Sequence, residues 1–197
     1  MSITDPFVNP LADEVTLGTP LVTADRRRLL LQYEVANDMS ESIYLVNRIA
    51  VWTWQGLSLD PNLVYTEILG DRLRLSKALI DIPQGETEDE VEAPYFSEVA
   101  PGALFTEMLE VPLPLEPFHP FDAVTSRDEV HRFDQVELAV GWLAESEVDI
   151  QLAQGQEGQI LIAADSQQVR RAQQLLVMTL PVSVPAYFGP SNAALSQ

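Results

Sequence analysis

The chain has 197 residues and a formal net charge of −19, from 30 acidic and 11 basic side chains. Hydrophobic residues make up 46% and charged residues 21%, which are ordinary values for a globular protein and exclude a disordered or fibrous chain. A chain of this mass can bury about 70% of its unfolded surface, enough for an unaided core. The excess of carboxylates disfavours nucleic acid and anionic membranes as partners and favours rapid encounter with basic proteins.

The chain contains no cysteine, which excludes disulfides, thiolate nucleophiles and metal sites built on cysteine. No asparagine begins an Asn-X-Ser/Thr sequence, so nothing indicates glycosylation. No apolar run reaches the roughly 20 residues that a membrane-spanning helix needs. Together these features favour a cytoplasmic location.

Short apolar runs broken by Pro, Gly, Asn and Asp dominate the chain and are typical of strands and turns. Residues 28–37 alternate in polarity, which predicts a strand with one face toward the core. The core-facing residues are expected to be Leu29, Leu31, Tyr33 and Val35. The three arginines at 26–28 are expected to form a solvated turn, with a phosphate or carboxylate contact as the alternative. Turn residues at 37–40 then precede a strand expected over residues 43–54.

A second pair of strands is expected at residues 64–68 and 73–80, on either side of a turn at Gly70. Most of the charge of this pair, which includes Asp71, is expected on its solvent-facing side. The cationic residues concerned are Arg72, Arg74 and Lys77.

Residues 86–92 carry five carboxylates and no cation, which predicts an exposed loop. A Pro-Gly pair at 101–102 predicts a turn before a strand over residues 104–111. The prolines that come next, between residues 112 and 120, cannot occupy a central strand and predict an edge or a long crossover.

The run from 133 to 143 has the clearest alternation in the chain and predicts a half-buried strand with Trp142 in the core. Another short strand is expected at residues 160–163. Helix-forming residues behind a possible N-cap, Ser166, predict a short helix that leads into a final strand.

Two groups of residues are candidates for binding a protein partner. The loop carboxylates would attract a basic surface through long-range electrostatics. The aromatic residues of the proline-rich segment would form a docking patch, unless that segment folds back and caps the sandwich. The candidate partner-binding residues are Glu86, Glu88, Asp89, Glu90, Glu92, Phe118, His119 and Phe121.

No catalytic residue, cofactor site or metal site is predicted. The chain lacks a Gly-X-Ser-X-Gly nucleophile motif, a glycine-rich phosphate loop and a calcium-loop pattern. Its two histidines, His119 and His131, do not have the spacing of a zinc motif. Thirty carboxylates make some close pair inevitable, so no pair is assigned a glycosidase role.

The main alternative rests on Trp52 and Trp54, which are two residues apart and so share one face of a strand. If exposed, the two rings would stack on sugars and indicate a carbohydrate-binding or carbohydrate-active module. If buried, they belong to the core.

The sequence therefore predicts one all-β domain over residues 15–188, with an N-terminal arm at 1–14 and a frayed tail at 189–197. Its expected architecture is an antiparallel β-sandwich of about seven to nine strands with one short helix, or else a partly open barrel. The strand number gives a general likeness to immunoglobulin-like sandwiches, which assigns no function. The expected function is a non-enzymatic, acidic protein-binding module, either an inhibitor or immunity-type partner of a basic protein or an accessory subunit of an assembly.

Overall fold

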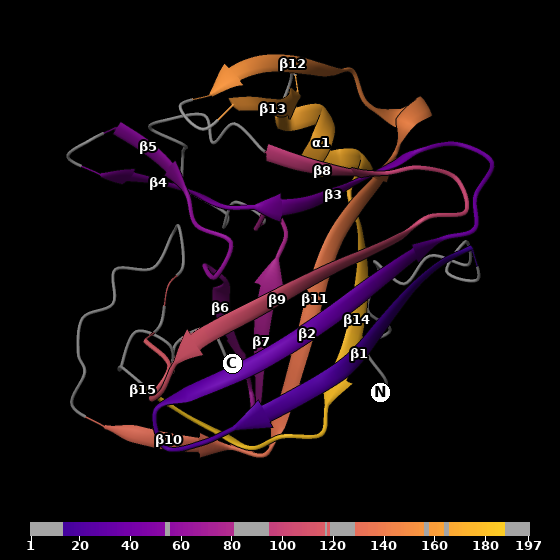
Figure 1. The fold of residues 1–197 in the computed structure, drawn as a ribbon. Helices are drawn as coiled ribbons and strands as arrows, with labels where there is room; N and C mark the ends of the chain where they lie inside the picture. The colour runs from indigo at the N-terminus through magenta and orange to yellow at the C-terminus, as the bar shows by residue number, and fades with distance from the viewer. Residues whose placement is uncertain are drawn as a thin grey trace.

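The computed structural model describes residues 14–53, 56–80, 95–116, 118, 129–155, 158–163 and 166–187. These residues form strands β1 to β15, one short α-helix and one 3-10 turn (Figure 1). The predicted all-β class is confirmed: sheets pack on one another, and the largest of them curls into part of a barrel. The strands are more numerous than the sequence predicted. One reason is that the single strand expected over residues 43–54 is divided in two at Ile49.

The described strands belong to two main sheets and two small ribbons. The first sheet has the order β1-β2-β9, with β1 (Val15–Ala24), β2 (Arg28–Asn37) and β9 (Leu104–Pro112). The second has the order β12-β13-β8-β3-β11-β7-β6, and β14 also pairs with β11. Its strands are β3 (Ile43–Arg48), β6 (Tyr65–Leu69), β7 (Arg72–Lys77), β8 (Tyr95–Val99), β11 (Gln135–Ala144), β12 (Ile150–Gly155), β13 (Gly158–Ala163) and β14 (Gln174–Leu180). The ribbons pair β4 (Ala50–Thr53) with β5 (Gly56–Leu59), and β10 (Val130–Phe133) with β15 (Val184–Tyr187).

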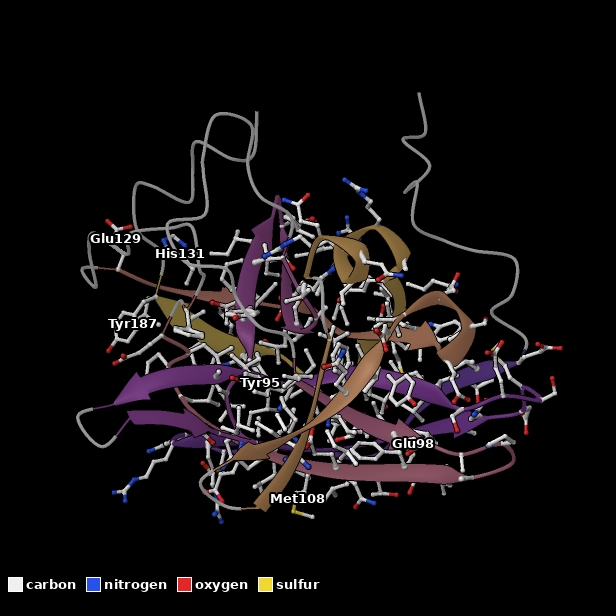
Figure 2. The ribbon with its side chains drawn as sticks, turned by 90° about the horizontal axis from the view of Figure 1, so that it is seen from above. Tyr95, Glu98, Met108, Glu129, His131 and Tyr187 are labelled. Atoms are coloured by element: carbon white, nitrogen blue, oxygen red, sulfur yellow. The ribbon has the colours of Figure 1, made fainter. Side chains whose placement is uncertain are left out.

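Strand β2 buries one face, as its alternating sequence predicted. Its four expected core residues, Leu29, Leu31, Tyr33 and Val35, are all fully buried. They face the second sheet and pack with residues of β3, β7, β11 and β14 in the main core. The first sheet therefore forms one layer of a sandwich, and its outer face carries side chains such as Met108, which Figure 2 shows at the rim of the molecule.

The strand β11 lies inside the second sheet, and this corrects one expectation. We expected a half-buried strand, but every residue of β11 after Gln135 is buried. It is an interior strand, since β14 pairs along one edge while β7 and β3 share the other, and residues of its two faces belong to different cores. One face joins the main core through Leu138 and Trp142, as predicted for Trp142. The opposite face is also covered.

A second core lies on that opposite face. There Tyr44, Phe96 and Leu143 pack against Val169 of helix α1 (Ser166–Ala172). The predicted helix at Ser166 and the strand after it are thus both present, and the helix provides a third layer at one end of the sheet (Figure 1).

Two predicted turns are also confirmed. Gly70 joins β6 to β7, and Gly102 joins β8 to β9. Both have positive φ, 68° and 70°, a backbone conformation that glycine adopts at little cost.

Candidate functional site

Most of the predicted partner-binding residues lie outside the described part of the chain. This holds for all five loop carboxylates, Glu86, Glu88, Asp89, Glu90 and Glu92, and for His119 and Phe121. Their contribution to binding stays a prediction. What the structure does define is where the acidic segment leaves and rejoins the fold.

The segment departs after Ile80 and returns at Tyr95, the first residue of β8. The departing end is held by the residues at the end of helix α1. The Gln173 side chain accepts a hydrogen bond from the Leu79 amide at 2.8 Å and donates one to the Leu79 carbonyl at 3.0 Å. The Arg170 guanidinium donates to the Ile80 carbonyl. Both ends of the acidic segment are therefore anchored on the second sheet.

Phe118 is the one predicted partner-binding residue that the structure describes. Its ring stacks on Tyr65, with centroids 5.3 Å apart and planes 15° from parallel. Its amide donates to Thr66 Oγ1 at 2.8 Å, and its carbonyl accepts from the Thr66 amide at 2.9 Å. Phe118 is thus half-buried against β6, which is how the alternative for this segment, a fold-back over the sandwich, would place it.

Carboxylates gather at one end of the sandwich, where four separate segments meet. The start of β1, the β2–β3 turn, the β8–β9 turn and the 3-10 turn η1 (Glu145–Glu147) come together there (Figure 1). Hydrogen bonds tie them: Ser146 donates its amide to Glu41 at 2.8 Å, and Ser42 donates its hydroxyl to Glu98 at 2.8 Å. We call this the acidic end, and it comprises Glu14, Asp38, Glu41, Glu98, Glu145 and Glu147.

None of these six carboxylates forms an ion pair with a cation among the described residues. Nearby, the pKa of Tyr44 is raised, first by burial and then by the negative charges of Glu98 and Glu145. In Figure 2 the labelled Glu98 lies at the side of the molecule opposite Glu129 and His131. Arg26 and Arg27 lie in the β1–β2 turn and Arg28 begins β2, at the far end of β2 from Asp38. There Arg28 forms ion pairs with Asp25 and Glu110, so this end of the first sheet has paired charges that the acidic end lacks among the described residues.

A second constellation is buried between the two main sheets. Tyr33 of β2 and Glu107 of β9 are directly paired in register, and Tyr33 Oη donates to Glu107 Oε2 at 2.5 Å. Asn47 Nδ2 of β3 donates to Glu107 Oε1 at 3.3 Å, and Lys77 Nζ of β7 lies 3.4 Å from Glu107 Oε2. Arg48 approaches the same carboxylate at 3.7 Å from a more exposed position. We call Tyr33, Asn47, Lys77 and Glu107 the polar core cluster.

The prediction that Lys77 faces solvent is wrong. Its side chain is fully buried, whereas Arg72 and Arg74 do lie on the other face of β7. Lys77 has the same strand parity as Leu73 and Leu75, and alternation therefore places it inward. The same parity applies to Glu107, which shares a face with Leu109. This signal was present in the sequence.

In the polar core cluster, burial and the Glu107 charge act against each other on the pKa of Lys77 and act together on the pKa of Tyr33. Burial lowers the pKa of Lys77 below its ordinary value, and the adjacent Glu107 carboxylate opposes that change. Burial also raises the pKa of Tyr33 well above its ordinary value, and Glu107 adds to that rise. Displaced titrations of this kind occur at catalytic sites and in structural ion pairs alike.

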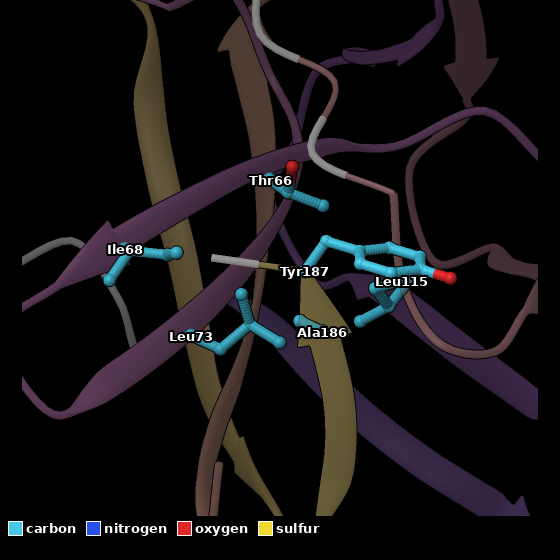
Figure 3. Close-up of a pocket in the computed structure, with 6 residues that line it drawn as sticks. All are labelled: Thr66, Ile68, Leu73, Leu115, Ala186 and Tyr187. Atoms are coloured by element: carbon cyan, nitrogen blue, oxygen red, sulfur yellow. The ribbon is translucent and has the colours of Figure 1, made fainter. Parts of the chain in front are cut away.

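The described residues contain no cluster of three or more His, Asp or Glu side chains that could hold a metal ion. An apolar hollow lies elsewhere, beside β6 and β15, and has no room for a water molecule (Figure 3). Its lining residues are Thr66, Ile68, Leu73, Leu115, Ala186 and Tyr187. It offers no polar group arranged for catalysis.

The tryptophan pair of the carbohydrate hypothesis is described only in part. Trp52 belongs to β4 and pairs with Leu57 of β5, but its side chain, and all of Trp54, lie outside the described residues. A sugar-stacking role for them stays a prediction.

Within the described residues, no helix is long and apolar enough to cross a membrane. No protein-family model matches the chain, and searches of curated proteins and of solved structures found no match.

Proposed function

We propose that this chain is a non-enzymatic, acidic protein-binding module, an inhibitor or immunity-type partner of a basic protein or an accessory subunit of an assembly. The observation that carries the proposal is the acidic end. There, carboxylates from four segments that are distant in sequence converge without ion-paired cations among the described residues. A concentrated negative field of this kind accelerates encounter with a positively charged surface.

The predicted acidic loop carries a second group of carboxylates. Its five carboxylates lie on a segment that leaves the second sheet at Ile80 and returns at Tyr95. The proposal includes the cytoplasmic location that the sequence favours, and a partner that is neither nucleic acid nor membrane.

The first experiment is capture of binding proteins from the source-cell lysate, at low salt and at ~0.5 M salt, where screening is strong. The captured protein is then purified, and its association rate is measured with the wild-type chain and with charge variants. One variant replaces the five loop carboxylates by their amides, and a second carries Glu14→Gln and Glu145→Gln. A matched control carries Asp71→Asn and Glu129→Gln, two exposed positions outside the acidic end.

We expect a basic partner that is released by salt. The loop variant and the acidic-end variant should associate more slowly, by roughly tenfold, with a flatter salt dependence, whereas the control should retain most of the wild-type rate. If the control variant associates as slowly as the acidic-end variant, the rate depends only on the net charge of the protein. That outcome would contradict a specific role for the acidic end. Capture that salt does not weaken would contradict the electrostatic proposal altogether.

A further inference from the structure

The ends of two strands meet at the polar core cluster. Strand β3 runs antiparallel to β11 and β7 runs parallel to it, and both pair along the same edge of β11. Leu45 lies opposite Trp142, and Lys77 lies opposite Val140. The two strands therefore approach each other head to head, and their carboxyl-terminal ends meet beside residues 140–142.

This meeting places an amine and a side-chain amide on the same carboxylate. Lys77 Nζ lies 3.2 Å from the main-chain oxygen of Asn47, and it also contacts the Pro61 carbonyl at 2.5 Å. The Glu107 carboxylate bridges the two side chains, since Oε2 faces Lys77 Nζ at 3.4 Å and Oε1 accepts from Asn47 Nδ2 at 3.3 Å. Among the described residues, Asn47 Oδ1 is buried and has no hydrogen-bond partner.

From this geometry we propose that the Lys77 side chain forms an intramolecular amide bond with the Asn47 side chain, with Glu107 transferring the protons and ammonia as the leaving group. The three groups are present in the arrangement that such a transfer needs. One carboxylate oxygen faces the nucleophile, and the other faces the nitrogen that must leave.

The step balances without any further reactant. A proton first passes from Lys77 Nζ to Glu107, which leaves a neutral amine and a neutral acid. The Nζ lone pair then forms a bond to Cγ of Asn47. Glu107 donates its proton to Nδ2 as the Cγ–Nδ2 bond breaks, and it takes a second proton from Nζ. The products are a secondary amide between the two side chains and one molecule of ammonia.

The surroundings favour this reaction over a stable ion pair. Lys77, Asn47 and Tyr33 are fully buried, so little water competes for the electrophile. Burial lowers the pKa of Lys77, which increases the fraction of neutral amine. Tyr33 Oη holds the Glu107 carboxylate in place at 2.5 Å. The reacting groups are therefore fixed in position before the step begins.

The bond would have a structural consequence. It would close the chain between residues 47 and 77, which contains β4, β5 and β6. A covalent link of this kind restricts the unfolded chain and so favours the folded state. It would also join the carboxyl-terminal ends of β3 and β7, which both pair with the same edge of β11.

The first test is the intact mass of the purified full-length chain. We expect a mass lower than that of the sequence by one ammonia. Lys77 is the chain's only lysine, so an amine-reactive reagent applied in denaturant should label the α-amine alone. The Asn47→Ala variant, labelled in denaturant where folding does not matter, should show the full mass and two reactive amines.

Tryptic mapping locates the bond. Cleavage at arginine should yield the peptide of residues 29–48 joined to that of residues 75–127, with no cleavage at Lys77. An unmodified mass overturns the proposal. So does a loss of ammonia with Lys77 still reactive, which would indicate a cyclic imide at Asn47, or a loss of one water with linkage to Glu107.

Discussion

At the scale of single residues, the main feature is a set of polar side chains at positions where strand alternation requires apolar ones. Tyr33, Asn47, Lys77 and Glu107 each face the main core from a different strand. Such residues are tolerated in a dry interior only when they satisfy one another, because an isolated buried charge costs several kcal/mol. The paired register of Tyr33 and Glu107 supplies the shortest of these contacts, at 2.5 Å.

Tyr33 predicts a specific loss of stability at alkaline pH. Its pKa is raised above the ordinary value of 10.0, so the folded protein keeps a proton that the unfolded chain releases. By linkage, this contribution is complete below pH 10.0 and is lost as the pH rises above it. We expect Tyr33→Phe to show a smaller decline in the free energy of unfolding above pH 10.0 than the wild type in urea titrations. Parallel declines would show that Tyr33 does not titrate in this way.

Two glutamates that pair with arginine, one buried and one exposed, allow the effect of burial on an ion pair to be tested. Glu137 is buried on β11 and accepts from Arg72 at 2.7 Å and Arg74 at 3.1 Å. Glu110 pairs with Arg28 at 3.0 Å on an exposed surface. Glu137→Ala removes the buried carboxylate that both arginines contact and should lower the free energy of unfolding by about 3–5 kcal/mol.

The matched change Glu110→Ala should cost much less than Glu137→Ala, because solvent screens an exposed pair. Both values come from chemical denaturation under the same conditions. Equal costs for the two variants would mean that burial does not determine the contribution of these pairs.

At the scale of elements, helix α1 matters because it positions the glutamine at its carboxyl-terminal end. Gln173 comes directly after the helix and bonds both main-chain groups of Leu79, as a neighbouring strand would. The same side chain covers Gly141 of β11. A Cβ at Gly141 would lie 2.5 Å from Gln173 Oε1 and 3.0 Å from Ala78 Cβ. The glycine therefore leaves room for the contact that anchors the departing end of the acidic segment.

This contact predicts a non-additive pair of substitutions. Gln173→Ala leaves the Leu79 amide and carbonyl without their partner and should cost about 1–3 kcal/mol. Gly141→Ala should destabilise by displacing the same side chain, with a smaller part from Ala78. In the double variant the second change should cost less than it does alone, as a double-mutant cycle measures. Strict additivity would contradict a shared mechanism.

At the scale of the whole molecule, a net charge of −19 acts against compactness, and the acidic end concentrates part of it. Mutual repulsion of like charges destabilises a folded chain, and salt screens that repulsion. Because the described carboxylates at the acidic end lack ion-paired cations, screening there should be favourable.

We therefore expect the melting temperature to rise between low salt and ~0.5 M sodium chloride. The rise should be smaller in the Glu14→Gln/Glu145→Gln variant than in the Asp71→Asn/Glu129→Gln control. Differential scanning calorimetry measures both. A melting temperature that falls with salt would show that attractive ion pairs, not repulsion at the acidic end, dominate the electrostatics of this protein.

Local features were predictable because their causes lie within a few residues. Alternation along β2 identified its core face, and glycines at 70 and 102 marked turns that need positive φ. Helix-forming residues after Ser166 identified α1. Alternation along β7 and β9 likewise indicated that Lys77 and Glu107 point inward, on the same face as the buried leucines of their strands. What parity does not show is that the two residues meet.

Partnership between distant strands was decided by the tertiary structure. The polar core cluster forms only because the two main sheets pack face to face. That packing places Asn47 of β3 and Lys77 of β7 against Glu107 of β9, which is paired with Tyr33 of β2. The burial of β11 on both faces and the convergence of six carboxylates have the same origin. The sequence by itself determined that segments such as β2 form strands and which face β2 presents to the core, because backbone geometry repeats every two residues. Which strands become neighbours depends on the packing of the whole chain, so the polar core cluster and the acidic end exist only in the folded molecule.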